Sequence, residues 1–310
     1  MRRLTLLFLL VLAACSTDDY DPARDYFTFA NTDEFISSHL ALDLLVDFES
    51  ARLSGNATLT LQWINKDARE VHLDTRDQSI ESTRVSSDGS NWSDSAFQVG
   101  QPDDRLGSKL TVTLPADLSP SDTLLVAIRY STDPESTALQ WLPKELTSGG
   151  QHPMLFSQSQ AIHARSWVPL QDTPSVRITY EADIRTRDDL LAVMSADNDP
   201  AADRDGDYRF EMPQPIPPYL LAIAVGNIYF APIGEDTGVY AEPEMLDAAT
   251  YEFADTQAMC EQAEELFGPY RWGRYDLLIL PPSFPFGGME NPRLSFLTPS
   301  LLAGDRSLVS

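Results

Sequence analysis

Alternating apolar and polar positions run through most of the chain between residues 40 and 225. The clearest case is residues 40–48, where every second position is a large apolar residue and two of the intervening positions are aspartates. A period of two is typical of a strand with one buried face. The alternation recurs at residues 59–63, 110–114, 124–130 and 176–180, and apolar runs of strand length occupy 190–194 and 220–225. We therefore predict an all-β unit made of many short antiparallel strands.

One loop of this region is rich in aspartate. Its acidic residues are Asp197, Asp199, Asp203, Asp205 and Asp207. Their spacing does not match an EF-hand calcium loop, whereas the Asp-Gly pair at 205–206 is typical of a hairpin reversal. We interpret the loop as a turn, with a calcium site as the alternative.

The pattern changes near residue 231. Apolar residues within 242–267 recur mostly every three or four positions, which is typical of a helix. Pro243 suits a first helical turn, and Gly268 with Pro269 suits a helix end. Either one long helix or a bent pair satisfies this pattern, and residues 277–280 predict a short buried strand. We place a domain boundary at this change.

The composition is that of a folded, strongly acidic protein. The chain has 310 residues, of which 43% are hydrophobic, so it is long enough for one large or two medium domains. Its 47 acidic and 22 basic residues give a formal net charge of -25. Such a charge repels nucleic acid and anionic lipid, so we expect no nucleic-acid partner.

Residues 1–15 have the pattern of a bacterial lipoprotein signal peptide. Arg2 and Arg3 precede an apolar stretch at 4–12, and small residues then lead to Cys15. The stretch is too short to span about 30 Å of hydrocarbon as a helix. We predict that Cys15 is lipidated and becomes the mature N-terminus, with a plain secretory signal as the alternative.

The residues after Cys15 refine this prediction. Ser16, rather than an aspartate, follows the cysteine, as in lipoproteins that are sorted to an outer membrane. We therefore expect a lipid-anchored protein of the bacterial cell envelope, in the outer membrane and facing the periplasm. Residues 16–26 are acidic and poor in apolar residues, which predicts a tether. If Cys15 carries lipid, Cys260 has no partner for an intrachain disulfide, and its helical pattern predicts a small core residue.

A motif near the end of the sequence points to a family. It reads Gly287-Gly288-Met289-Glu290-Asn291, and it follows two prolines and Ser283-Phe284-Pro285-Phe286. The motif resembles the exopeptidase motif of the zinc aminopeptidases that include aminopeptidase N and leukotriene A(4) hydrolase. Residues 160–165, 171–176, 275–285 and 298–305 are similar to the leukotriene A(4) hydrolase branch in particular. The resemblance is recognisable from about residue 151 to residue 308, and it covers the N-terminal portion of the family.

The resemblance implies a binding site for the free amino end of a peptide. Glu290 resembles the carboxylate that pairs with the α-ammonium of the substrate, and the two glycines leave room for an extended backbone. The further residues that the resemblance places at this site are Gln158, Ser159, Gln160, Pro285, Phe286 and Met289. Phe286 stands where the leukotriene branch commonly has tyrosine. Without the resemblance, these residues fit a tight turn, a solvated acid and a polar loop.

The zinc ligands of the family have no counterpart in this sequence. The family's His-Glu-x-x-His helix follows the motif's glutamate by about two dozen residues, and the sequence stops at Ser310. The histidines are His39, His72, His152 and His163, and no two of them have the spacing of that helix. We expect zinc in the full-length family, no metal bound by this chain alone, and no hydrolysis by it.

The resemblance also implies the fold and the function. It implies a mainly β N-terminal domain at 27–231, an antiparallel and saddle-like β-sandwich, followed at 232–310 by the α+β beginning of a thermolysin-like catalytic domain. We predict the N-terminal part of a membrane-anchored zinc metallo-aminopeptidase, whose partners are peptides with a free N-terminus and, through the lipid, a membrane. The alternative is a short lipoprotein that binds peptides without catalysis.

Overall fold

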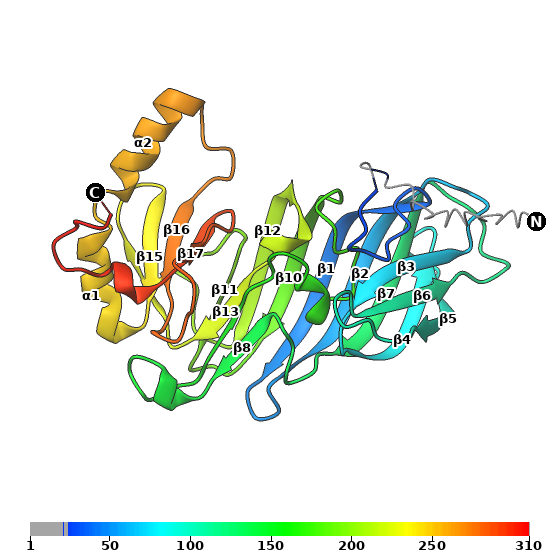
Figure 1. Ribbon diagram of the computed structural model, residues 1–310, viewed down its shortest axis with the longest axis horizontal. Helices are drawn as coiled ribbons and strands as arrows, with labels where there is room; N and C mark the ends of the chain where they lie inside the picture. The colour runs from blue at the N-terminus through cyan, green and yellow to red at the C-terminus, as the bar shows by residue number, and fades with distance from the viewer. Residues whose placement is uncertain (1–20, 22–23, 310) are drawn as a thin grey trace, which may run out of the picture.

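The computed structural model of the protein describes residues 21 and 24–309. The predicted signal peptide, Cys15, and residues 16–20 and 22–23 of the predicted tether lie outside the described residues. Three β-sheets follow one another along the molecule, and two α-helices lie at the C-terminal end (Figure 1). None of the helices in this described part is long and apolar enough to cross a membrane.

The first sheet curls along its length and has nine strands in the order β12-β10-β1-β2-β7-β4-β5-β6-β3 (Figure 1). These strands are β1 (Phe35–Asp47), β2 (Arg52–Trp63), β3 (Glu70–Thr75), β4 (Ser79–Ser86), β5 (Ser93–Val99), β6 (Ser108–Thr113), β7 (Thr123–Ser131), β10 (Ile178–Arg185) and β12 (Asp207–Ile216). The alternation seen in the sequence selects the buried face, since Leu40, Leu42 and Leu44 of β1 all lie in the core. This sheet confirms the predicted mainly β fold of the N-terminal part.

Two features of this sheet differ from the predicted array of short antiparallel strands. β1 has 13 residues and β2 has 12. In addition, β1 pairs with β10 in parallel, with Leu40 opposite Tyr180 and Leu44 opposite Ile184. The two strands lie far apart in the sequence, and a local apolar pattern carries no information about the direction of a distant partner.

The second sheet has four strands in the order β11-β13-β9-β8. They are β8 (Leu139–Leu142), β9 (Met154–Ser157), β11 (Leu191–Met194) and β13 (Ile223–Gly226). All residues of β9, β11 and β13 are buried, so these strands read as apolar runs rather than as alternating patterns. Their side chains join those of the first sheet in one continuous core.

The aspartate-rich loop contains a turn at Gly206, as the sequence predicted, but this turn is not a simple hairpin reversal between two consecutive strands. β10 and β12 pair directly, with Arg185 opposite Asp207, and the chain between them leaves the first sheet to form β11. Gly206 has a φ of +86°, and a Cβ there would lie 2.6 Å from the Thr186 carbonyl oxygen. The Asp-Gly pair therefore lies where the chain re-enters the first sheet after forming β11. The local sequence is the same for such a return as for a direct hairpin between neighbouring strands.

The third sheet carries the C-terminal part of the chain in the order β14-β15-β16-β18-β17. Its strands are β14 (Tyr229–Pro232), β15 (Thr237–Ala241), β16 (Tyr275–Ile279), β17 (Gly288–Met289) and β18 (Leu294–Leu297). The predicted helical region forms two helices, α1 (Pro243–Glu252) and α2 (Thr256–Phe267), which confirms the bent pair over the single long helix. Pro243 occupies the first turn of α1, as predicted.

The packing of the two helices differs. Residues of α1 pack with those of β15 and β16 in a separate small core that includes Val239, Ala249 and Leu277. In contrast, α2 projects away from the sheet (Figure 1), and Thr256 is its one buried residue. Four 3-10 helices occur in the described part, at Lys144–Leu146 (η1), Ala164–Ser166 (η2), Pro218–Leu220 (η3) and Pro299–Leu301 (η4).

Candidate functional site

The glycine-rich motif forms the outer edge of the third sheet. The chain leaves β16, makes a turn in which the Phe284 N–H donates to the Pro281 carbonyl oxygen (2.9 Å), and returns as the short strand β17. Among the strands of the described residues, β17 pairs with β18 alone, with Gly288 opposite Leu297. Its other side is a sheet edge, where backbone groups are open to an added strand.

The residues of the motif divide into buried and exposed groups. Met289 is buried and Gly288 is half-buried, and a Cβ on Gly288 would lie 3.1 Å from Leu297 Cδ2. Pro285, Phe286, Gly287 and Glu290 are exposed. The Glu290 carboxylate lies beside this edge, with Oε1 3.6 Å from the position of a Cβ on Gly288. A negative charge and an open backbone edge therefore occur together.

An aromatic contact fixes the motif to the second sheet. The buried ring of Phe284 meets that of Phe156 in β9 edge to face, with 5.5 Å between centroids, and it meets Phe286 at 5.7 Å. Such pairs contribute roughly 0.5–1.5 kcal/mol beyond the area that they bury. The 158–160 loop directly follows β9. The glycine-rich motif and this loop, the two predicted parts of the site, are therefore both attached to β9.

The 158–160 loop presents one glutamine to solvent. Ser159 is buried, donates through Oγ to the Leu221 carbonyl oxygen (2.8 Å) and accepts from Trp167 Nε1 (3.1 Å). Gln158 is half-buried, and its Oε1 accepts from the Gln160 N–H (3.1 Å). Gln160 itself is exposed. Ser159 and Gln158 thus set the shape of the loop, and the Gln160 side chain is the one free to meet a ligand.

The histidines are dispersed, and each has its own partner. The contacts are His39 Nδ1 with Thr179 Oγ1 (2.7 Å), His72 Nε2 with Glu70 Oε2 (3.5 Å), His152 Nδ1 with Asp189 Oδ2 (3.2 Å) and His163 Nδ1 with Thr137 Oγ1 (2.9 Å). Burial, together with nearby arginines, lowers the pKa of His163. Among residues 21 and 24–309, no three His, Cys, Asp or Glu side chains lie close enough to hold a metal ion. The described residues therefore do not fit a zinc ion.

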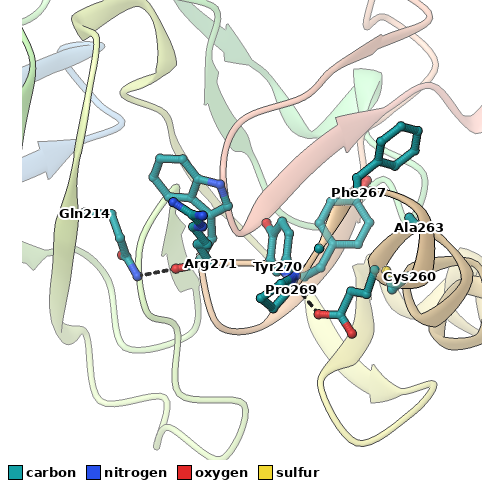
Figure 2. A pocket seen from close by; sticks show the side chains of 11 residues that line it. Gln214, Cys260, Ala263, Phe267, Pro269, Tyr270 and Arg271 are labelled. Atoms are coloured by element: carbon teal, nitrogen blue, oxygen red, sulfur yellow. Dashed lines mark hydrogen bonds between the residues drawn. The ribbon is translucent and has the colours of Figure 1, made fainter.

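A cavity of about 560 Å³ lies beside α2, and its lining is mostly apolar (Figure 2). Its walls come from α2, from the loop at 268–272 and from Tyr275. Cys260 lies at this wall and is half-buried, so the expectation that it is a core residue is wrong. Burial raises the pKa of its thiol, and Glu264 and Glu261 raise it further. The spacing of apolar residues predicted the helix correctly, but it did not reveal that α2 buries little of its surface.

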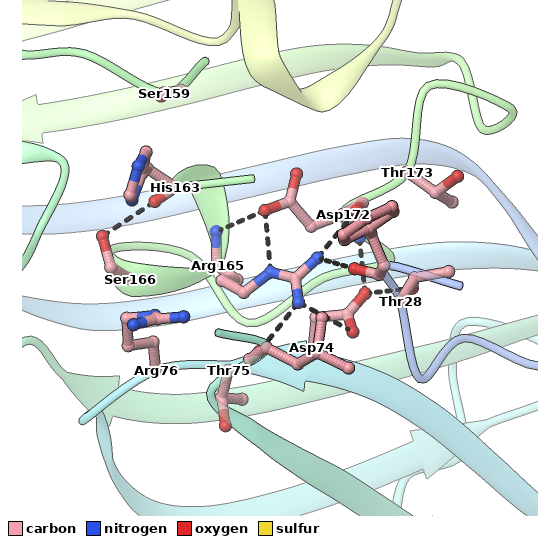
Figure 3. Close-up of polar contacts among 12 residues, drawn as sticks. Thr28, Asp74, Thr75, Arg76, Ser159, His163, Arg165, Ser166, Asp172 and Thr173 are labelled. Carbon is pink, nitrogen blue, oxygen red and sulfur yellow. Dashed lines mark hydrogen bonds and ion pairs between the residues drawn. The ribbon is translucent and has the colours of Figure 1, made fainter. Parts of the chain in front are cut away.

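Two segments that carry the resemblance meet in a buried ion-pair cluster (Figure 3). The Arg165 side chain is fully buried, with Nε 3.0 Å from Asp172 Oδ2 and Nη1 3.5 Å from Asp74 Oδ1. The remaining Arg165 N–H groups donate to the carbonyl oxygens of Leu106, Phe27 and Asp172. The sequence did not single out Arg165, because its partners come from four separate segments.

The same cluster holds the start of the described chain in place. Asp74 accepts from the Phe29 N–H (2.7 Å), from Thr28 Oγ1 (2.5 Å) and from the Asp172 N–H (2.9 Å). Burial raises the pKa of Asp74, and it raises the pKa of Asp172 to about 6, although Arg165 opposes both shifts. Both oxygens of Asp74, the Oδ2 atom of Asp172 and the Arg165 guanidinium thus have partners, and one guanidinium serves the two carboxyl groups.

Comparison with known protein families gives two adjoining matches. Residues 35–220 match the Peptidase M1 N-terminal domain, and residues 251–310 match the Peptidase family M1 domain. The leukotriene A-4 hydrolase of Xenopus laevis is 44% identical over 291 residues, which are 92% of this chain and 47% of that protein. Leucine aminopeptidase 2 of Yarrowia lipolytica is 42% identical over 292 residues, with 93% of this chain and 43% of that protein covered.

Comparison with solved structures gives the same family as the sequence comparison. Yeast LTA4 hydrolase in complex with bestatin superimposes with a TM-score of 0.85 at 39% identity, covering 94% of this chain and 44% of that one. An M1 zinc metallopeptidase mutant of Deinococcus radiodurans, bound to a Tyr-Ser-Ala substrate, has a TM-score of 0.64 at 20% identity, covering 85% and 60%, which shows the fold alone. This chain spans about half the length of the curated relatives it matches.

Proposed function

Since this chain belongs to the M1 peptidase family, we propose that it supplies the N-terminal domain and the amino-end-binding motif of a zinc aminopeptidase that removes N-terminal residues from peptides. The single observation that carries the proposal is the exposed Glu290 carboxylate beside the open edge of β17. The relatives named above support the reaction class, since one of them is a leucine aminopeptidase that is 42% identical to this chain.

The proposed binding mode follows from these two features. An extended peptide adds to the free side of β17 through backbone hydrogen bonds, and Gly287 allows close approach because its Cβ position is open. The α-ammonium of the peptide then pairs with Glu290, which sets how far the substrate advances. Gln160, from the loop after β9, contacts the same end of the peptide.

We assign binding, not hydrolysis, to the chain alone. Its His, Cys, Asp and Glu side chains do not form a ligand set in the described part, so these residues offer no place for the metal of a zinc aminopeptidase. The purified 310-residue protein is expected to leave an aminoacyl-4-nitroanilide intact in the presence of zinc, and measurable release of nitroaniline is the contrary result.

A lipid anchor at Cys15 completes the proposal. The support is the sequence of residues 1–15, and the consequence is a peptidase held at the bacterial envelope, in the outer membrane and facing the periplasm. Metabolic labelling with a fatty acid tests it. Label should enter the wild-type protein and not Cys15→Ser, and equal labelling of the two would exclude the anchor.

The test of binding compares a free peptide with its blocked form. We expect the full chain to bind Tyr-Ser-Ala about tenfold or more tightly than N-acetyl-Tyr-Ser-Ala, because a charge-assisted hydrogen bond contributes about 1.5–3 kcal/mol. Glu290→Gln should remove this preference, measured by calorimetry. Glu49→Gln changes an exposed glutamate in the turn between β1 and β2 and serves as the control. A preference that survives Glu290→Gln contradicts the proposal.

A further inference from the structure

We propose that Arg293 is a positioning residue, which fixes the Glu290 hairpin against the N-terminal β-domain. The role deepens the proposed function and rests on it, because the hairpin matters for peptides only if Glu290 binds them. Arg293 follows Glu290 by three residues and ends the turn between β17 and β18. Its guanidinium pairs with Asp197 and Gln214, so an effect of Arg293 on peptide binding acts through Glu290.

The backbone of Arg293 is held in an unfavourable conformation. Its φ is +67°, a left-handed region that is rare for residues other than glycine, asparagine and aspartate. The N–H donates to Tyr270 Oη (3.3 Å), and the carbonyl oxygen accepts from the Asp276 N–H (2.9 Å). Such a conformation costs free energy in a residue other than glycine, and it persists only where the surroundings hold it. Glycine would adopt this turn without that cost, so the side chain has a role of its own.

The side chain joins the hairpin to the other domain. Arg293 is 7% exposed, with Nη1 2.9 Å from Asp197 Oδ1 and Nη2 3.3 Å from Gln214 Oε1. Gln214 belongs to β12, and the Asp197 N–H donates to the Glu211 carbonyl oxygen of the same strand (2.9 Å). Both partners are thus tied to the first sheet, whereas Arg293 belongs to the third.

Arg293 completes a two-point attachment of the motif. At one end, the Phe284 ring packs on Phe156 of the second sheet. At the other end, Arg293 reaches β12 of the first sheet. Glu290 lies between these two points and is itself exposed, so its position relative to the 158–160 loop depends on both. Without Arg293, the polar contact with the first sheet is lost, and the turn that carries Glu290 is held by the apolar contacts of Phe284 and Met289 alone.

A purely stabilising role is the competing explanation, and the chain offers a matched control for it. Arg306 is also an arginine with a positive φ (+61°), and its Nη1 lies 3.5 Å from Asp255 Oδ2, a residue between the two helices and away from the motif. Arg293→Gly and Arg306→Gly therefore remove the same side chain from the same backbone conformation. Glycine accepts either φ, so neither variant is expected to misfold.

The experiment has two readouts on the full chain. The first is hydrogen exchange of the backbone amides at 288–291, where the Asn291 N–H donates to the Met289 carbonyl oxygen (3.0 Å). We expect exchange to become at least about tenfold faster in Arg293→Gly and to stay unchanged in Arg306→Gly. The second is the affinity ratio between Tyr-Ser-Ala and its N-acetyl form, which should fall severalfold in Arg293→Gly and recover in part in Arg293→Lys.

The outcomes separate this inference from the proposed function. If exchange at 288–291 is the same in the two glycine variants, Arg293 does not position the hairpin and the inference is overturned. If Arg293→Gly lowers the unfolding midpoint but keeps the affinity ratio, the role is structural and the inference again fails. If the wild-type chain shows no preference for the free peptide, the proposed function fails, and the exchange readout still decides whether Arg293 orders the hairpin.

Discussion

Replacing Arg165 with methionine should destabilise the protein strongly at neutral pH. The variant keeps much of the volume but leaves Asp74 and Asp172, both almost fully buried, without their countercharge. Removing one partner of a buried ion pair costs about 3–5 kcal/mol, because the remaining charge stays buried and uncompensated. The cost can be measured by urea-induced unfolding at pH 7.5, followed by tryptophan fluorescence, since Trp167 is buried in the same region.

The pH dependence tests the cause. The folded-state pKa of Asp172 is raised to about 6 from a usual 3.8, so its contribution favours folding below about pH 4 and is lost as the pH rises through 6. Arg165 lowers the pKa of Asp172 and of Asp74, so its removal raises both pKa values further. Protonation then relieves the unpaired charges in acid, and the cost of Arg165→Met should be smaller at pH 5.5 than at pH 7.5.

An exposed ion pair provides the matched control. Arg129 Nε lies 2.8 Å from Glu81 Oε2, but both side chains are more than half exposed. Arg129→Met should therefore change the free energy of unfolding by no more than about 1 kcal/mol, with little pH dependence. A loss below about 1 kcal/mol for Arg165→Met, or an equal loss at both pH values, would refute the assignment of a buried charge network.

Three further outcomes are expected. Gly55→Ala should lower the unfolding free energy by about 2 kcal/mol or more in urea titration. Gly55 has a φ of +151°, and a Cβ added there would lie 1.9 Å from the Asp43 carbonyl oxygen. An unchanged unfolding midpoint would contradict the β1–β2 register. Phe284→Ala should cost about 3 kcal/mol through the lost contact with Phe156, and Phe284→Leu should cost less. In a Cys15→Ser chain, Cys260 should react with iodoacetamide more slowly at pH 7 than a free peptide cysteine, and rapid alkylation would show that its pKa is not raised.

The sequence carried the fold class and the family, and it missed the long-range pairings. The alternation in β1 and β2 and the apolar runs of β11 and β13 follow from burial on one face or on both, which each strand shows by itself. The parallel pairing of β1 with β10 is not a local property, because it depends on where a distant segment returns. The sequence also indicated a reversal at the Asp-Gly pair 205–206 but not the preceding excursion through β11, for the same reason.

For the candidate site, the motif indicated Glu290 and the neighbouring glycines, because their spacing along the chain is itself the signal. It gave no sign that Met289 and Ser159 are buried. Nor did it indicate Arg293, whose partners Asp197 and Gln214 lie on earlier strands and loops. The backbone strain at Arg293 could not be predicted, because the residue type alone does not reveal a positive φ.

What the sequence determined by itself is the set of faces and motifs: which side chains seek the core, where helices begin and end, and which residues resemble the amino-end-binding motif of a peptidase. Only the tertiary structure decided how these pieces meet. It brought the ring of Phe284 against that of Phe156 and the guanidinium of Arg165 between two buried aspartates. It also placed Arg293, close to Glu290 in the chain, where it contacts residues tied to the first sheet. The physical reason is that burial and propensity act on each segment, whereas packing and charge compensation exist only between segments that the fold brings together.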